Sequence, residues 1–281
     1  MRLTIRIITD GGADFPQGMP EKCGLHIVPL HVTFGNEPFD LRLGMQAFYS
    51  NIKTNSVLPK TASPSPQDFV EAFNQYPGDD ILVIALSSGL SSTYQHAVLA
   101  KEMVLEENSG RRIEVIDTRT GSIGQALVAY RCWQEIQAGK PFDDVVAAAY
   151  AIALGSGTLF YLDTLENLVK GGRLNQAKGA IASVLNIKLF MQASLEGTVE
   201  VVEKVRGKKN ALARLIDKFD ELGGPADGRV LGIAHSTTEE EVRGILDRIL
   251  AKHPFREVFI AEVGPVIGTY AGEGGIVVSY A

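Results

Sequence analysis

The chain has 281 residues, of which 45% are hydrophobic and 21% charged, and its formal net charge at pH 7 is −6. This composition is typical of a soluble globular protein with one or two domains, and the negative charge argues against nucleic acid or an anionic membrane surface as a partner. No apolar run approaches the roughly 20 residues that would cross a bilayer, so we expect no stable membrane insertion.

The cysteines and the first residues indicate a cytoplasmic protein. Cys23 and Cys132 are far apart and show no Cys-x-x-Cys spacing, so two reduced thiols are expected rather than a disulfide. Residues 1–6 resemble a charged strand and not a signal peptide. The five histidines and the acidic residues show no metal-ligand spacing, so we expect neither a metal nor another cofactor.

Short apolar strands alternate with helical patterns in the first part of the chain. This alternation is typical of an α/β domain with a mainly parallel sheet. The expected strands are residues 2–9, 26–34, 81–86, 113–116 and 158–162, and the expected helices are residues 45–52, 66–76, 92–107, 122–138 and 143–154.

The second part of the chain continues in the same style. Strands are expected at residues 187–193, 199–205, 230–234, 258–263 and 275–279, and helices at residues 210–222 and 239–253. Leu195-Glu196-Gly197 favours a hairpin turn, and Gly223-Gly224-Pro225 predicts the end of a helix. We place a domain boundary at Gly155-Ser156-Gly157, which divides the chain into two α/β domains, residues 1–157 and 158–281.

Two hydroxyl-rich segments, residues 60–69 and 86–95, lie at the starts of expected helices. In the first, Ser65 is placed to cap a helix, Pro66 suits the first helical position, and Asp68 lies three residues after the cap. Two such turns can surround one anion with hydroxyls and backbone N–H groups. A carboxylate or a phosphate is the ligand that suits such a site.

Thr61 and Ser91 are the candidate anion ligands in these segments. A hydroxyl donates one hydrogen bond and accepts two, so a pair of hydroxyls can hold one carboxylate. The alternative is that both side chains only cap helices, which is the commonest role of Ser and Thr in such turns.

Two basic turns supply further candidates. Lys170-Gly171-Gly172-Arg173 follows a helical pattern, and Arg173 offers a forked donor for an anion. The alternative is a helix end with a solvated arginine. Arg206-Gly207-Lys208-Lys209 follows an expected strand. An exposed basic turn is the simpler interpretation, and the alternative is that Arg206 supports an anion site.

Five glycines fall within residues 264–275. A tight connection between strands and a loop that closely contacts a ligand are both consistent with this density. The segment has no Gly-Lys-Ser/Thr sequence and we expect no helix after it, so it is neither a Walker loop nor a dinucleotide-binding turn. No Gly-x-Ser-x-Gly elbow occurs, which weighs against a hydrolase.

Together these segments resemble the DegV family, the bacterial fatty-acid-binding proteins that include the carrier subunit of fatty-acid kinase. The resemblance covers nearly the whole chain and rests on the order and spacing of several motifs. The matching segments are Ile8–Asp10 with Ala13–Asp14, Thr61–Pro66, Ser87–Gln95, Val115–Thr118, Leu165–Arg173, Asn186–Lys188, Glu203–Arg206 and Gly264–Gly274.

The resemblance implies a long-chain fatty acid, of the palmitate, stearate or oleate class, in a buried tunnel between two α/β domains. It implies that Thr61 and Ser91 hold the carboxylate, and that Arg173 and Arg206 belong to the surrounding hydrogen-bond network. It also implies a carrier that is not itself an enzyme, with a separate ATP-dependent kinase subunit forming the acyl phosphate. A tunnel suits this ligand because each buried CH₂ contributes about 0.8 kcal/mol.

Three departures from the family pattern involve four positions. Tyr270 stands where the last motif usually carries a histidine, and tyrosine cannot hold a positive charge near pH 7. This change weakens the inference of a kinase partner more than the inference of binding. Ser92 replaces a glycine beside the carboxylate site, and Gly11-Gly12 replaces Ser-Thr in a nearby loop. We include Ser92 and Tyr270 among the expected ligand-binding residues.

Two other functions stay open on the sequence. One is an acyl hydrolase or transferase with Ser91 as its nucleophile, which needs a base within reach. The nearest histidine in sequence, His96, lies five residues along the helix, a spacing that turns it away from Ser91. The other is a regulatory protein in which lipid is only structural.

Overall fold

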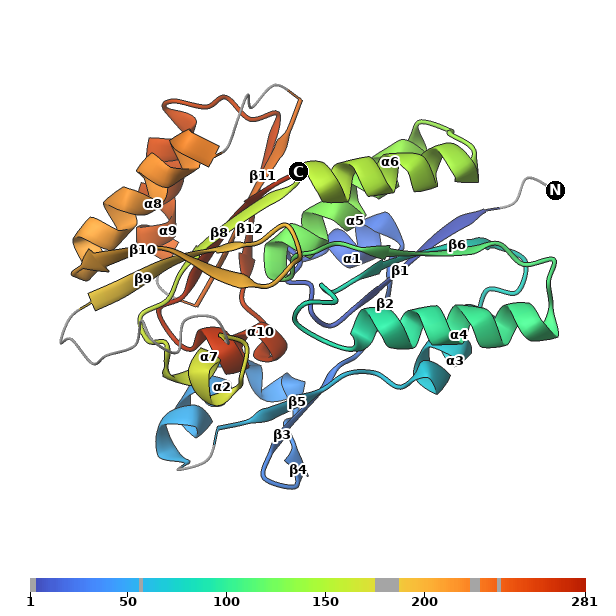
Figure 1. Ribbon diagram of the computed structural model, residues 1–281, viewed down its shortest axis with the longest axis horizontal. Helices are drawn as coiled ribbons and strands as arrows, with labels where there is room; N and C mark the ends of the chain where they lie inside the picture. Colours follow the sequence, from blue (N-terminus) through green and yellow to red (C-terminus); the bar gives the residue numbers. More distant parts are fainter. Residues whose placement is uncertain (1–3, 56–57, 175–186, 223–227, 237–238) are drawn as a thin grey trace.

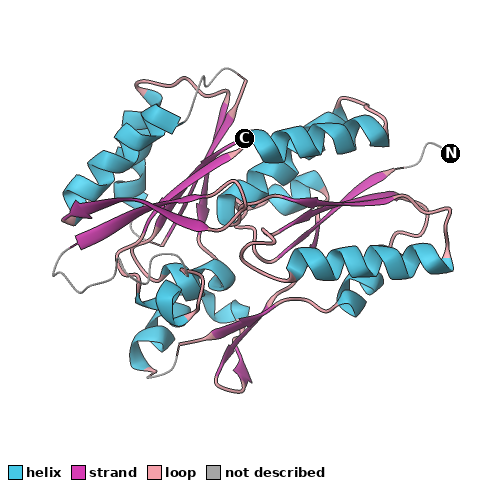
Figure 2. Cartoon of the chain, in the orientation of Figure 1, coloured by secondary structure: helices cyan, strands magenta, loops and turns pink. Residues whose placement is uncertain are grey.

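The computed structural model describes residues 4–281 with four gaps, at residues 56–57, 175–186, 223–227 and 237–238. The described residues form a mixed α/β fold with a four-stranded sheet, a six-stranded sheet and a small three-stranded sheet (Figure 1). Figure 2 shows that helices flank both larger sheets. The expected α/β class is confirmed.

The four-stranded sheet is built by the N-terminal part of the chain and is entirely parallel. Every residue of its central strand β6 is buried, as expected for a strand covered by helices on both faces. The strands, in the spatial order β2-β1-β6-β7, are His26–Val28, Ile5–Asp10, Asp80–Ala85 and Ile113–Asp117.

Within the described residues, two helices cover each face of this sheet (Figure 1). One face carries α3 (Pro66–Asn74) and α4 (Thr93–Glu107), and the other carries α5 (Ser122–Gln137) and α6 (Phe142–Gly155). Side chains alternate across a strand, so successive residues of β6 pack into two separate cores.

The six-stranded sheet is mixed and is built by the C-terminal part of the chain. Helices α8 (Lys208–Leu222) and α9 (Glu239–Leu250) pack on one face of it. The strands, in the spatial order β10-β9-β8-β13-β11-β12, are Val199–Arg206, Ile187–Ala193, Gly157–Tyr161, Ile276–Tyr280, Val230–His235 and Glu257–Glu262.

Helix α5 packs against both larger sheets. Val128 and Ala129 belong to the core beneath the parallel sheet, whereas Ile123 and Leu127 pack against strands β11 and β13 of the other sheet. Its residues 122–130 are all buried. Burial on every side of this half of the helix is expected for a position between two layers, so α5 joins the two sheets.

The remaining elements are short and lie near the ends of the larger ones. A small core of Leu30, Val32, Phe48, Leu86 and Val266 holds several of them together. These elements are α1 (Met19–Cys23), β3 (His31–Phe34), β4 (Glu37–Pro38), the 3₁₀-helix η1 (Leu41–Leu43), α2 (Gly44–Thr54), β5 (Lys60–Ala62), α7 (Glu166–Lys170) and α10 (Pro265–Ala271).

The structure corrects three expectations about these elements. Residues 26–34 form two strands in different sheets, because Pro29 lacks the N–H that would continue the ladder of β2. Lys60–Ala62 is strand β5 and not a turn. The glycine-rich segment 264–275 contains helix α10, which begins with Pro265 in its first turn.

Three other expectations remain untested. The helix end at residues 223–225 and the family motif residue Asn186 lie outside the described residues. The domain boundary between residues 157 and 158 stays a prediction.

Candidate binding site

A largely apolar cavity lies between the two parts of the chain. It contains about 850 Å³ of space not filled by protein atoms, part of which is open to solvent. Leu86 and Leu90 line it from the N-terminal part, and Phe160, Leu162 and Val266 line it from the C-terminal part. Such a cavity suits an apolar ligand.

One end of this cavity is polar. A second cavity adjoins it there, and Thr61, Arg173 and Tyr270 line both spaces. Lys60 and Lys170 line only the second cavity. The three shared residues therefore mark the junction between an apolar chamber and a polar one.

Thr61 reaches this junction because it lies in β5, where it is paired with Val32 of β3. Its Oγ1 lies 2.6 Å from the hydroxyl of Tyr270, 209 residues away in α10. The capping role belongs instead to Ser65, whose Oγ accepts from the N–H of Asp68 at 3.2 Å. The predicted capping box is thus confirmed, and helix capping does not account for Thr61.

Ser91 connects the two hydroxyl-rich segments. Its Oγ lies 2.8 Å from the Oγ of Ser63 and 2.8 Å from the Oγ1 of Thr93. Ser92 donates to the same Ser63 hydroxyl at 3.0 Å. Ser91 also accepts from the N–H of Thr93 at 3.3 Å, although the N-cap of α4 is Ser92, and Ser91 lines the cavity.

Arg173 lies across the same junction. Its Nη1 donates to Gly171 O at 2.7 Å, and its Nε donates to Leu90 O at 3.4 Å. Its guanidinium lies 4.7 Å from the centre of the Tyr270 ring, a favourable arrangement of a cation over an aromatic face. The positive charge is therefore held beside the hydroxyls of Thr61 and Tyr270.

The structure brings four of the six expected ligand-binding residues to the cavity: Thr61, Ser91, Arg173 and Tyr270. Ser92 is exposed and contacts the site through Ser63. Arg206, at the end of β10, is exposed and lines neither of the two cavities. The ligand roles of all six stay predictions.

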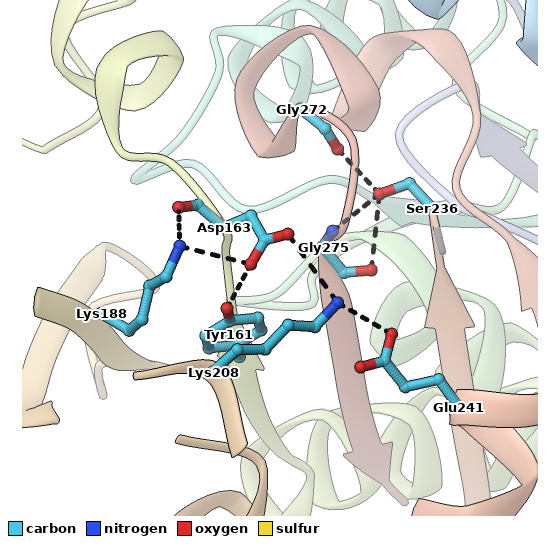
Figure 3. A network of polar contacts seen from close by, with 8 residues as sticks. All are labelled: Tyr161, Asp163, Lys188, Lys208, Ser236, Glu241, Gly272 and Gly275. Atoms are coloured by element: carbon cyan, nitrogen blue, oxygen red, sulfur yellow. Dashed lines mark hydrogen bonds and ion pairs between the residues drawn. The ribbon is translucent and has the colours of Figure 1, made fainter. Parts of the chain in front are cut away.

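The turn after α10 holds Tyr270 in position. Ser236 Oγ donates to Gly272 O at 2.7 Å and accepts from the N–H of Gly275 at 2.9 Å, as Figure 3 shows. The turn passes so close to Asp163 that a Cβ on Gly274 would lie 2.3 Å from its carboxylate. Gly274 also has a φ of 83°, which favours glycine.

Asp163 is the centre of a polar network at the end of β8 (Figure 3). Its carboxylate accepts a hydrogen bond from Tyr161 and pairs with Lys208 at 3.8 Å. Lys188 donates to its backbone oxygen at 2.7 Å. The family motif residue Lys188 is therefore used to hold the end of β8.

Two buried carboxylates lie beneath the cavity, and the sequence did not single them out as functional. Asp10 accepts from the N–H groups of Leu86 and Gly12, each at 2.8 Å. Asp14 accepts from Ser122 Oγ at 2.5 Å and from the N–H of Gly264 at 2.8 Å. Burial raises the pKa of each carboxyl to about 6, because desolvation disfavours the charged form.

Close packing explains one departure from the family pattern. A Cβ on Gly12 would lie 2.8 Å from a methyl carbon of Leu86 and 2.9 Å from the carboxylate of Asp10. Leu86 lines the cavity. The small residue at position 12 thus leaves space for an apolar side chain of the cavity wall.

The structure does not favour Ser91 as a nucleophile. The Nδ1 of His96 lies 2.7 Å from the carbonyl oxygen of Pro64, and since a carbonyl only accepts, this nitrogen carries the proton. Within the described residues no hydrogen bond joins His96 to Ser91.

Two further searches of the described residues gave negative results. No group of three or more His, Cys, Asp or Glu side chains there is arranged to hold a metal ion. None of the helices in that part of the chain is both long enough and apolar enough to cross a bilayer.

Known proteins are similar to this chain over nearly its whole length. A family model described as "Uncharacterised protein, DegV family" matches residues 4–281. The chain belongs to the DegV family. A DegV domain-containing protein of Clostridium perfringens is 30% identical to it, over 98% of this chain and 96% of that protein. The predicted membership of the DegV family is confirmed.

Solved DegV structures share its fold. A DegV family protein of Ruminococcus gnavus, refined with vaccenic acid, has a TM-score of 0.92 and 30% identity, over 98% of this chain and 99% of that one. The Streptococcus pneumoniae fatty acid kinase B3 protein, loaded with linoleic acid, has a TM-score of 0.86 and 28% identity, over 99% of both chains. DegV proteins similar to this one therefore bind fatty acids.

Proposed function

We propose that this DegV protein binds one long-chain fatty acid, with the acyl chain in the apolar cavity and the carboxylate at its polar end. The carboxylate accepts hydrogen bonds from the hydroxyls of Thr61, Ser91 and Tyr270 and lies beside the guanidinium of Arg173. One observation carries this proposal. Hydroxyls from two distant segments and one arginine converge at a single end of an otherwise apolar cavity.

The physical requirements of the two halves of the ligand support this assignment. Each methylene that enters the cavity contributes about 0.8 kcal/mol, less the cost of ordering the chain. A carboxylate loses far more than that on leaving water unless donors replace its hydration. Hydroxyls and a guanidinium are suitable donors, and hydrogen bonds to a charged group are the stronger kind.

The proposal extends to a carrier role. The polar cavity beside Arg173, which Lys60 and Lys170 also line, gives a partner access to the carboxylate while the acyl chain stays buried. The likeness to the S. pneumoniae fatty acid kinase B3 protein supports presentation to a separate ATP-dependent kinase. In this role the chain performs no catalysis itself and needs no cofactor besides its bound lipid.

Extraction of the purified protein with organic solvent, followed by mass spectrometry, tests the binding role directly. We expect a long-chain fatty acid in near-stoichiometric amount. An empty extract, together with no uptake of added palmitate or oleate, contradicts the proposal.

Two substitutions test the position of the carboxylate. After delipidation, Thr61→Val and Ser91→Ala should each weaken palmitate binding about tenfold to hundredfold, since each removes a hydrogen bond to a charged group. Titration with a fluorescent fatty acid measures the change. The matched control is Ser65→Ala, which removes a hydroxyl from the same segment but lines neither cavity. Unchanged affinity in both variants shows that the carboxylate lies elsewhere.

A further inference from the structure

Three small side chains form part of the wall of the apolar cavity and do not line the second, polar cavity. Thr120 follows β7, Thr158 lies in β8 and Ala193 ends β9. All three also line a separate surface pocket, which contains about 380 Å³ of unfilled space. A wall one residue thick therefore separates the apolar cavity from this pocket.

The wall is held by hydroxyl contacts within the protein. Thr120 Oγ1 lies 2.7 Å from Thr158 Oγ1, which lies 2.9 Å from the Oγ of Ser279. A Cβ on Gly124 of α5 would lie 2.6 Å from the Thr120 hydroxyl and 2.7 Å from the Thr158 hydroxyl. Both hydroxyls are thus directed at α5 and at each other. Neither threonine brings a charge to the cavity wall.

The pocket beyond the wall is bordered by two exposed leucines as well as by polar side chains. Leu154, near the end of α6, is 68% exposed, and Leu195, at the tip of the β9–β10 hairpin, is 76% exposed. Two leucines this exposed at one pocket are available to cover an apolar chain that emerges there. The leucines suit an apolar chain, whereas Arg119, Ser156 and Ser194 make the rest of the pocket lining polar.

We propose that Thr120, Thr158 and Ala193 form the wall that sets the longest acyl chain this protein accepts. This inference rests on the proposed fatty-acid function. A chain whose carboxylate is at Thr61 and Ser91 ends at the wall. When the wall is opened, the cavity and the surface pocket become one space, and longer chains extend past it to Leu154 and Leu195.

Chain-length profiles of delipidated variants test the wall. We expect Thr158→Ala to shift the preferred acid from shorter to longer members of the series myristate, palmitate, stearate, arachidate and behenate. Each methylene that newly enters the pocket should add about fourfold in affinity. The wild-type protein should lose affinity at the length where the chain meets the wall.

Two further variants keep the test decisive. Ser279→Ala is the matched control, because it removes a hydroxyl contact of Thr158 without lining either space, and it should leave the profile unchanged. Ala193→Leu thickens the wall and should shift the preference to shorter acids, which decides the question if Thr158→Ala fails to fold.

The inference and the proposed function fail in different ways. Identical profiles for wild type, Thr158→Ala and Ala193→Leu, all with palmitate still bound, overturn the wall alone. The same shift in Ser279→Ala as in Thr158→Ala also overturns it. Failure of the wild-type protein to bind any acid in the series overturns the binding function itself.

Discussion

At the scale of single residues, Tyr270 is the most unusual feature of the site. The motif resemblance predicts a histidine at this position, and the tyrosine contacts two other candidate site residues, Thr61 through its hydroxyl and Arg173 through its ring. A tyrosine hydroxyl both donates and accepts, so it can orient Thr61 and donate to a carboxylate. It cannot supply the positive charge of a histidine, but the guanidinium of Arg173 lies 4.7 Å from the centre of its ring.

The substitution Tyr270→Phe separates the role of the hydroxyl from the role of the ring. It removes the hydroxyl but keeps the ring beneath Arg173. We expect fatty-acid affinity to fall about tenfold to hundredfold, the range of one hydrogen bond to a charged group. Tyr150→Phe is the control, because the Tyr150 hydroxyl binds Glu114 outside the cavity. Equal affinities in the two variants mean that the Tyr270 hydroxyl takes no part in binding.

At the scale of elements, the β9–β10 hairpin joins the two parts of the chain. Its tip rests on the turn between β6 and α4, where Ser87 Oγ donates to Gly197 O at 2.7 Å. A Cβ on Gly89 would lie 2.8 Å from the backbone of Gly197. Gly197 lines the cavity, so this contact places a wall of the binding site.

Gly89→Ala should therefore disturb both binding and stability. The added methyl group meets backbone atoms that can yield only if the hairpin tip moves, and overpacking of this kind costs about 1–3 kcal/mol. Urea unfolding and palmitate titration measure the two effects. The control is Gly78→Ala, where nothing lies within 4 Å of the added Cβ. If Gly89→Ala behaves like Gly78→Ala, the hairpin contact has no part in shaping the site.

At the scale of the whole molecule, Asp14 links three parts of the fold. It lies in the loop after β1, and it binds the first residue of α5 and the residue before α10. Asp10 is the last residue of β1, and the negative charge of Glu262 also faces Asp14. Both carboxyl groups have a pKa of about 6 in the folded protein, raised from 3.8 by burial.

These raised pKa values predict an unusual dependence of stability on pH. The folded state binds a proton more tightly than the unfolded state, so each group stabilises the fold fully below pH 3.8 and loses that effect as the pH rises through about 6. The largest possible contribution is about 3 kcal/mol for each group. The free energy of unfolding should therefore fall between about pH 4 and about pH 7, with most of the loss below pH 6.

Asp14→Asn removes one of these titrations. The difference in the free energy of unfolding between the two ends of this pH range, measured by urea unfolding, should therefore become smaller. Asp144→Asn, on the exposed surface of α6, removes a carboxylate without touching the link between the sheets. Equal pH dependence in wild type and Asp14→Asn contradicts a proton-linked role for Asp14.

Local features of the fold could be predicted from the sequence because their partners are near in the chain. Ser65 and Asp68 form the expected capping box, and most strands and helices lie within a few residues of their expected ranges. The order and spacing of the motifs were also sufficient to predict the family. The same reasoning failed at residues 26–34 and 264–275, where tertiary packing decides which sheet a short strand joins and whether a glycine-rich segment becomes a helix.

The sequence by itself determined the α/β class, the family, and the residue types suited to an anion. Only the tertiary structure decided which of those residues meet. Thr61 and Tyr270 are 209 residues apart, and Asp14 and Gly264 are 250 apart. No local pattern encodes such pairs, because they exist only once both sheets have packed on α5. The same packing leaves Arg206 outside both cavities and places Thr120, Thr158 and Ala193 at one wall.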